Sequence, residues 1–283
     1  MSTPGTPVLF LHGFWHGTWC WSEVLARVTS AGARALAVDM AGHGLRARRP
    51  AAAAARPFDP ARLASEPSPV AGVTLDEASD LLVSQVEALG GGQPVTVVAH
   101  SMGGNVLTRA TQPAPGLFAH AVYLCALMPA SGVPANDYIF MPENEGELVV
   151  PSLVANPLET GGLRLDPASA DPAYRQRLRD CFYGDVDSAV ADAAIALLIP
   201  DAPAGIAVGA TALTADGWGS VARSYVACTQ DRALRPPVQR KFIADADAAF
   251  PGNPATVHVL DSSHSPFLSM PGQVADIVLK LPA

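Results

Sequence analysis

The feature that most constrains this chain is a serine that follows a run of β-branched residues and precedes two glycines. Residues 95–100 read Val-Thr-Val-Val-Ala-His, which is typical of a buried strand, and Ser101 is followed by Met-Gly-Gly. A sharp turn from strand to helix exposes a serine hydroxyl to a base, and it needs small residues two before and two after the serine. Ala99 and Gly103 are both small, although glycine is the usual residue at the first position. The pattern predicts a nucleophile elbow at Ser101, and an ordinary strand, turn and helix with an incidental serine is the alternative.

Two loops in the last quarter of the sequence carry residues that would activate such a serine. Residues 224–228 and 255–260 read as short strands, with Asp231 in the loop after the first and His264 in the loop after the second. This order of serine, acid and histidine is the one expected with a nucleophile elbow, and it differs from both protease orders. Asp261 is the alternative acid, but it stands too near His264 in sequence to place its carboxylate under the ring. We therefore predict that Asp231 and His264 form a catalytic triad with the serine of the elbow.

The electrophilic half of the predicted site lies at the start of the chain. Residues 7–11 form an apolar run, typical of a strand that is buried on both faces, and a loop rich in glycine, histidine and tryptophan follows. In this arrangement the loop supplies one backbone N–H to an oxyanion hole, and the residue after the nucleophile supplies the other. We expect these donors to be Phe14 and Met102. His12 and His16 are interpreted as hydrogen-bonding to the loop backbone rather than as metal ligands.

Composition excludes several classes of function. The 283 residues, of which 49% are hydrophobic, are enough for one domain with a large core. A net charge of −8 disfavours nucleic acid as a partner. The first strand begins close to Met1, and no apolar run is long enough to span a bilayer, so we expect neither a signal peptide nor a membrane partner. The cysteines are isolated, which predicts a cytoplasmic protein and no metal site: Cys20, Cys125, Cys181 and Cys228.

Predicted strands and helices alternate along most of the chain, which favours a mostly parallel sheet with helices on both faces. Thr74 and Glu77 form a capping box before a helix that extends to Leu89. Residues 46–72 interrupt the alternation with alanines and prolines, and either form a surface loop or fold over the pocket rim. The other interruption, residues 130–215, contains two predicted helices and is expected to be an inserted helical cap.

Five motifs together resemble the α/β-hydrolase superfamily, namely residues 12–21, 39–44, 99–104, 228–233 and 263–266. Within it, the chain resembles the branch of plant methylesterases, hydroxynitrile lyases and bacterial esterases. The resemblance covers nearly the whole chain and implies an α/β-hydrolase fold. It implies a core of residues 1–129 and 216–283, with residues 130–215 as the cap insertion.

Two positions favour hydrolysis over cyanohydrin cleavage. Lyases of this branch carry a threonine after the first histidine of the oxyanion loop and a lysine after the triad histidine. This chain has Gly13 and Ser265 at those positions. We therefore expect a serine carboxylesterase that acts through an acyl-enzyme on small, largely apolar esters and needs no cofactor. A small-molecule receptor with a weakly active triad and a non-catalytic scaffold are the alternatives.

The pocket of such an enzyme is expected to be apolar. Aromatic residues and a methionine are its candidate walls, and plain core packing is the alternative interpretation for each. Besides Phe14, these candidates are Trp15, Met128, Tyr138, Phe140 and Trp218.

Overall fold

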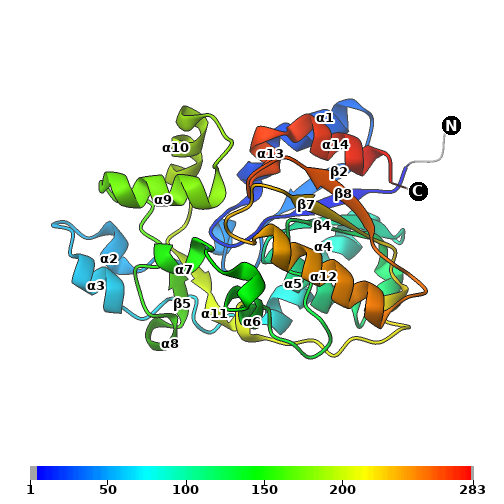
Figure 1. Ribbon diagram of the computed structural model, residues 1–283, viewed down its shortest axis with the longest axis horizontal. Helices are drawn as coiled ribbons and strands as arrows, with labels where there is room; N and C mark the ends of the chain where they lie inside the picture. Colours follow the sequence, from blue (N-terminus) through cyan, green and yellow to red (C-terminus); the bar gives the residue numbers. More distant parts are fainter. Residues whose placement is uncertain (1–4, 282–283) are drawn as a thin grey trace.

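A parallel sheet forms the centre of the protein. The computed structural model describes residues 5–281, and within them six strands form one sheet in the order β2-β1-β3-β4-β7-β8, every neighbouring pair being parallel (Figure 1). In this order the strands are β2 (Ala35–Val38), β1 (Val8–Leu11), β3 (Val95–His100), β4 (Phe118–Leu124), β7 (Arg223–Cys228) and β8 (Thr256–Leu260). The alternation in the sequence therefore predicted the sheet correctly.

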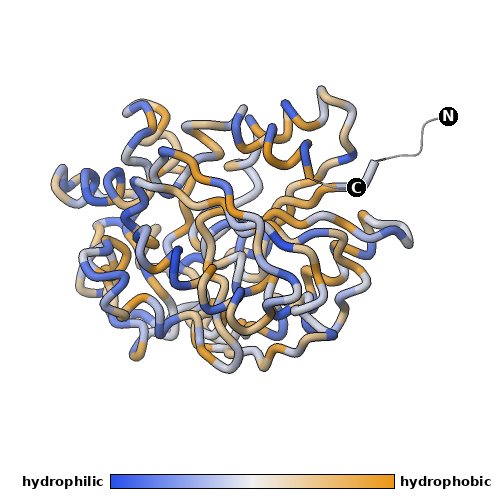
Figure 2. The backbone as a smooth tube through the Cα atoms, turned by 45° about the vertical axis from the view of Figure 1, so that its right-hand side comes forward, coloured by the Kyte–Doolittle hydropathy of each residue, from blue (hydrophilic) through white to orange (hydrophobic). Residues whose placement is uncertain are grey.

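The four inner strands β1, β3, β4 and β7 are buried on both faces, whereas β8 at one edge is largely exposed. Successive strand residues point to opposite faces, so they enter different core clusters. Leu9 and Leu11 pack into one core cluster, while Val8 and Phe10 pack into the other. Figure 1 shows α1 and α14 together on one face, and α4, α5 and α12 on the other. Their bounds are α1 (Ser22–Ser30), α14 (Pro271–Leu279), α4 (Leu75–Gly90), α5 (Gly103–Thr111) and α12 (Pro236–Ala249). In Figure 2 the central strands are mostly orange, as expected for strands without a solvent-facing side.

The longest of these helices, α4, has the start that the sequence predicts. The Thr74 hydroxyl accepts from the backbone N–H of Glu77, and the Glu77 carboxylate accepts from the backbone N–H of Thr74. Gly91 ends the helix in the left-handed region, with φ of 58°. The capping box is therefore confirmed.

The chain between β4 and β7 forms a group of short elements. In Figure 1 they lie together at the left, with α2 (Ala51–Ala54) and α3 (Pro60–Ser65) beside them. In chain order they are α6 (Ala135–Ile139), α7 (Val149–Ser152), α8 (Pro157–Thr160), β5 (Gly162–Arg164), α9 (Pro172–Phe182), α10 (Ser188–Leu197), β6 (Asp201–Pro203) and α11 (Ala204–Val208). Helices α9 and α10 were expected, whereas the antiparallel pair β5-β6 was not.

A buried ion pair joins this group to the segment of residues 46–72. The Arg164 guanidinium donates to both carboxylate oxygens of Asp201, at 2.6 and 2.7 Å, and both side chains are fully buried. The remaining Arg164 nitrogen donates to the carbonyl oxygens of Leu63 and Glu66 at 2.5 and 2.7 Å. Arg164 thus links the β5-β6 pair to α3 and to the residue that directly follows α3.

Among residues 5–281, no helix combines the length and the apolar character needed to cross a bilayer.

Candidate active site

The predicted elbow is formed where β3 meets α5. β3 ends at His100, Ser101 has a φ of 53°, and α5 begins at Gly103. A positive φ is costly for a residue with a side chain, so the surrounding packing must hold Ser101 in this conformation. A Cβ atom on Gly103 would lie 2.7 Å from the carbonyl oxygen of His12, so only glycine fits there. Ala99 is fully buried within β3, and its methyl group is accommodated.

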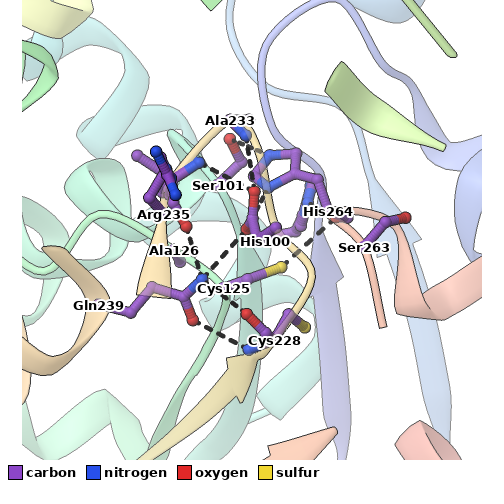
Figure 3. A network of polar contacts seen from close by, with 12 residues as sticks. His100, Ser101, Cys125, Ala126, Cys228, Ala233, Arg235, Gln239, Ser263 and His264 are labelled. Atoms are coloured by element: carbon purple, nitrogen blue, oxygen red, sulfur yellow. Dashed lines mark hydrogen bonds and ion pairs between the residues drawn. The ribbon is translucent and has the colours of Figure 1, made fainter. Parts of the chain in front are cut away.

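The structure brings Ser101, Asp231 and His264 together from the carboxyl ends of β3, β7 and β8. The Nδ1 atom of His264 is 2.7 Å from Oδ2 of Asp231, and its Nε2 atom is 3.0 Å from Oγ of Ser101. Because a carboxylate only accepts hydrogen bonds, Nδ1 carries the proton and Nε2 is left to accept from the serine hydroxyl. Asp231 and His264 are buried, which keeps water from competing for these contacts. Figure 3 shows the ring of His264 beside Ser101.

Asp231 is held by three donors besides the histidine. Its Oδ1 atom accepts from the backbone N–H groups of Ala233 and Leu234, at 2.8 and 2.9 Å. The side-chain amide of Gln239 in α12 donates to Oδ2 at 3.3 Å. These contacts fix the carboxylate beneath the ring of His264.

Gln239 is a residue of this site that the sequence analysis missed. It is fully buried, and its amide also donates to the carbonyl oxygens of Leu234 and Cys228 while accepting from the backbone N–H of Cys228. Figure 3 shows these contacts between α12 and the end of β7. Its helical spacing from Phe242 and Ala246, which are both buried, was the available signal.

Asp261, the alternative acid, does not take part in this hydrogen-bonded group. Its side chain is exposed and accepts from the Thr229 hydroxyl and the Gln230 amide. The Thr229 contact is the main reason that the pKa of Asp261 is lowered.

Two buried side chains, His100 and Cys125, hold the backbone of the loop that carries His264. The carbonyl oxygen of His264 accepts from Nε2 of His100 at 2.8 Å and lies 3.4 Å from the Cys125 thiol. Burial lowers the pKa of His100 well below its usual value, so the ring is neutral. These three residues are also the one group within residues 5–281 whose donor atoms are close enough for a metal ion. Burial raises the pKa of Cys125, however, and a protonated thiol is a poor metal ligand.

The residues of the two expected oxyanion donors, Phe14 and Met102, line the same cavity as Ser101. Phe14 follows β1, and Met102 precedes α5. Within the described part of the chain, neither backbone N–H group has a hydrogen-bond partner. Both are therefore free to donate to a bound oxygen atom.

Histidines hold the loop after β1 in place. Nδ1 of His16 donates to the Phe14 carbonyl oxygen, and its Nε2 accepts from the Tyr183 hydroxyl, each at 2.9 Å. His43 accepts from the backbone N–H of Trp15, which has a φ of 62°. Burial lowers the pKa of His16 and of His43 to about 3, so both rings are neutral.

A cavity of about 190 Å³ opens above Ser101 and His264. Trp15 and Phe140 line it, as expected, together with apolar residues such as Leu127, Leu153 and Leu163. Apart from Ser101 and His264, Asn136 is the one lining residue with a polar, non-aromatic side chain. The wall is therefore suited to a largely apolar ligand.

Three expected wall residues lie outside this cavity, and their assignment is corrected. The Tyr138 hydroxyl accepts from the backbone N–H of Ala130, and its ring packs on Phe242. The indole of Trp218 donates to the Tyr123 hydroxyl at 2.7 Å. Met128 and Trp218 both line a separate, much smaller cavity. Each of the two aromatic side chains thus has a hydrogen-bond partner away from the cavity.

The cavity lining also decides whether residues 46–72 fold over the pocket rim. None of these residues contributes to the cavity above Ser101. Leu63 is buried against the inserted segment, while Phe58 is 44% exposed. The segment packs beside the inserted elements rather than over the serine.

Comparison with known proteins gives one family and several relatives. The alpha/beta hydrolase family matches residues 8–277. Methylesterase 9 of Arabidopsis thaliana is 26% identical over 286 residues, covering 96% of this chain and 96% of its own. Esterase PIR7B of Oryza sativa subsp. japonica is 27% identical over 287 residues, covering 96% and 94%. A pyrethroid hydrolase from Sphingobium faniae JZ-2 superposes with a TM-score of 0.72 at 21% identity, covering 97% of this chain and 96% of that one.

Proposed function

Because this chain belongs to the alpha/beta hydrolase family, we propose that it is a serine esterase with Ser101, His264 and Asp231 as its triad. Its α/β-hydrolase fold, with the parallel sheet covered on both faces, agrees with the prediction from sequence. The relatives at nearly full coverage are named methylesterases and esterases, which supports ester hydrolysis as the reaction class.

The observation that carries the proposal is the distance of 3.0 Å between Nε2 of His264 and Oγ of Ser101. His264 takes the proton of Ser101 as the oxygen attacks the ester carbonyl, and the tetrahedral intermediate forms. The protonated ring then gives that proton to the departing alkoxide, so an alcohol leaves and an acyl-enzyme remains. His264 next takes a proton from water, whose attack releases the carboxylic acid and restores Ser101.

Two groups lower the energy of the charged states. The free N–H groups of Phe14 and Met102 donate to the carbonyl oxygen as it becomes negatively charged. The Asp231 carboxylate holds His264 in the productive tautomer and offsets the positive charge that the ring acquires. All of these groups belong to the protein, and the reaction needs no cofactor.

Residues 130–215 serve in this proposal as the cap of the enzyme. Most of the cavity wall beyond the triad comes from α6, α7, α8 and α11 and the turns beside them. The wall excludes water from the reacting carbonyl and limits the size of the ester that reaches Ser101.

The packing around Gly13 argues against the lyase reaction. A Cβ atom at this position would lie 2.5 Å from the Cβ atom of Ser101. The threonine expected of a hydroxynitrile lyase therefore does not fit without moving the serine. Ser265 likewise supplies no cation to stabilise cyanide.

Turnover of p-nitrophenyl acetate tests the function. We expect a burst of one p-nitrophenol per enzyme, an acetyl group on Ser101 by mass spectrometry, and no turnover by Ser101→Ala. Mandelonitrile should release negligible cyanide. Turnover that stays very slow in the folded protein would indicate a receptor, and cyanide release as fast as ester hydrolysis would indicate a lyase.

A further inference from the structure

Exposed hydrophobic side chains gather at the mouth of the cavity. Phe140 is 69% exposed, Val150 37%, Leu158 95% and Val208 58%. All four line the cavity that reaches Ser101, although they come from separate parts of the inserted segment. Large apolar side chains that collect on one part of a surface usually mark a binding site. We call these four residues the apolar rim.

We propose that the apolar rim binds a hydrocarbon chain of the ester substrate that extends beyond the cavity. This inference rests on the proposed esterase function, and it specifies the substrate class as neutral esters with a long apolar arm. The arm is either the acyl chain or the alkyl chain of the alcohol, because both chains extend from the same ester group.

The size of the cavity is the first argument. Its volume of about 190 Å³ is below the range of roughly 300–1,000 Å³ that is typical of pockets for drug-sized ligands. An ester with a longer arm must therefore pass through the mouth. The rim residues are the surface that it meets there, and they line the same cavity as Ser101.

The chemistry of the wall is the second argument. Its lining contains no carboxylate, ammonium or guanidinium group. The indole N–H of Trp15 donates to the carbonyl oxygen of Leu163 at 2.9 Å, so that ring presents an apolar surface to the cavity. A charged arm would lose its hydration without gaining a partner, whereas a hydrocarbon arm gains by leaving water.

Two series of esters test the proposal below their aggregation concentrations. One series is p-nitrophenyl esters from acetate to dodecanoate, and the other is acetate esters of alcohols from ethanol to decanol. Beyond about six carbons, each methylene that contacts the rim should raise kcat/KM by roughly two- to fourfold in one of the series. Leu158→Ser and the double variant Phe140→Ser/Leu158→Ser should reduce the ratio of kcat/KM between the longest and shortest esters.

Leu197→Ser is the matched control, because Leu197 is 52% exposed on α10 and does not line the cavity. It should keep the wild-type ratio. The proposal is overturned if both series stay flat beyond six carbons, if the rim variants keep the full ratio, or if rates rise only once the ester aggregates. Hydrolysis of the acetate esters in those cases leaves the proposed function intact, whereas no hydrolysis of any ester would remove both proposals.

Discussion

A Cβ atom at Gly13 would lie 2.5 Å from the Cβ atom of Ser101, a distance that packed side chains essentially never show. It would also lie 3.0 Å from Nδ1 of His100. The loop after β1 therefore passes so close to Ser101 that a methyl group at position 13 requires the loop or the serine to move.

Gly13→Ala should lower kcat for p-nitrophenyl acetate by about 10², because a displacement of about 1 Å at a reacting atom costs this much. The control is Gly116→Ala, since a Cβ atom at Gly116 meets nothing within 4 Å. Steady-state kinetics on both folded variants make the comparison. Equal activity of the two variants would show that the loop yields to the methyl group.

Asp231→Asn should lower kcat by up to about 10⁴, the scale measured for the same change in the triad of another serine hydrolase. The amide favours the wrong tautomer of His264. Asp261→Asn is the matched change and should have little effect, because Asp261 contacts Thr229 and Gln230 instead. Greater damage from Asp261→Asn in a folded protein would contradict the assignment of the acid.

Gln239→Leu should lower kcat between about tenfold and 10²-fold with a smaller change in KM, because Asp231 loses a donor that orients it. Titration of active sites from the burst amplitude separates this effect from a loss of folded enzyme. Gln230→Leu is the control, since the exposed Gln230 amide contacts Asp261. If Gln239→Leu lowers the burst amplitude but not kcat per active site, Gln239 has a structural role only.

Arg164→Met should lower the free energy of unfolding by about 3–5 kcal/mol, because it leaves the buried Asp201 carboxylate without its cation. Arg109→Met is the matched control. It removes a pair with Asp76, whose side chain is 67% exposed, and should cost at most about 1 kcal/mol. Urea unfolding measures both values, and similar losses would contradict the importance assigned to the buried pair.

Stability should fall as pH decreases from about 6.5 towards 4.5. Burial keeps His16 and His43 neutral with a pKa of about 3, against 6.5 in the unfolded chain. The unfolded state therefore binds more protons across this window, and acid favours it. His43→Gln should show a shallower decrease of Tm, since glutamine can also accept from Trp15 and donate to the Ala41 carbonyl. An unchanged slope would show that His43 does not contribute.

The strands and the elbow were predictable because they depend on local patterns. β3 is a run of β-branched residues, and the capping box at Thr74 is a motif of four residues. The direction of a buried aromatic side chain depends on distant partners instead. Trp218 donates to Tyr123 in the sheet, and the Arg223 guanidinium lies 4.0 Å from its ring.

Short strands and buried polar residues were harder to predict from the sequence. β5 and β6 have three residues each, which is too short for a periodic pattern. Glutamine is mostly an exposed residue type, and helical spacing was the one local signal that Gln239 is buried. Its contacts with Cys228 and Asp231 come from the fold and cannot be read from that spacing. Sequence patterns thus predicted the three side chains that the structure brings together, while long-range contacts determine the lining of the cavity and the hydrogen bonds to Asp231.

The origin of the cavity wall has a consequence for how such a protein diversifies. Ser101, Asp231 and His264 follow strands of the sheet, whereas most of the remaining wall is encoded by one continuous stretch, residues 136–208. Random mutagenesis confined to that stretch changes most of the cavity wall and leaves Ser101, Asp231 and His264 unmutated. For the proposed esterase, gene duplication followed by drift in this stretch alone is therefore a short route from one substrate preference to another.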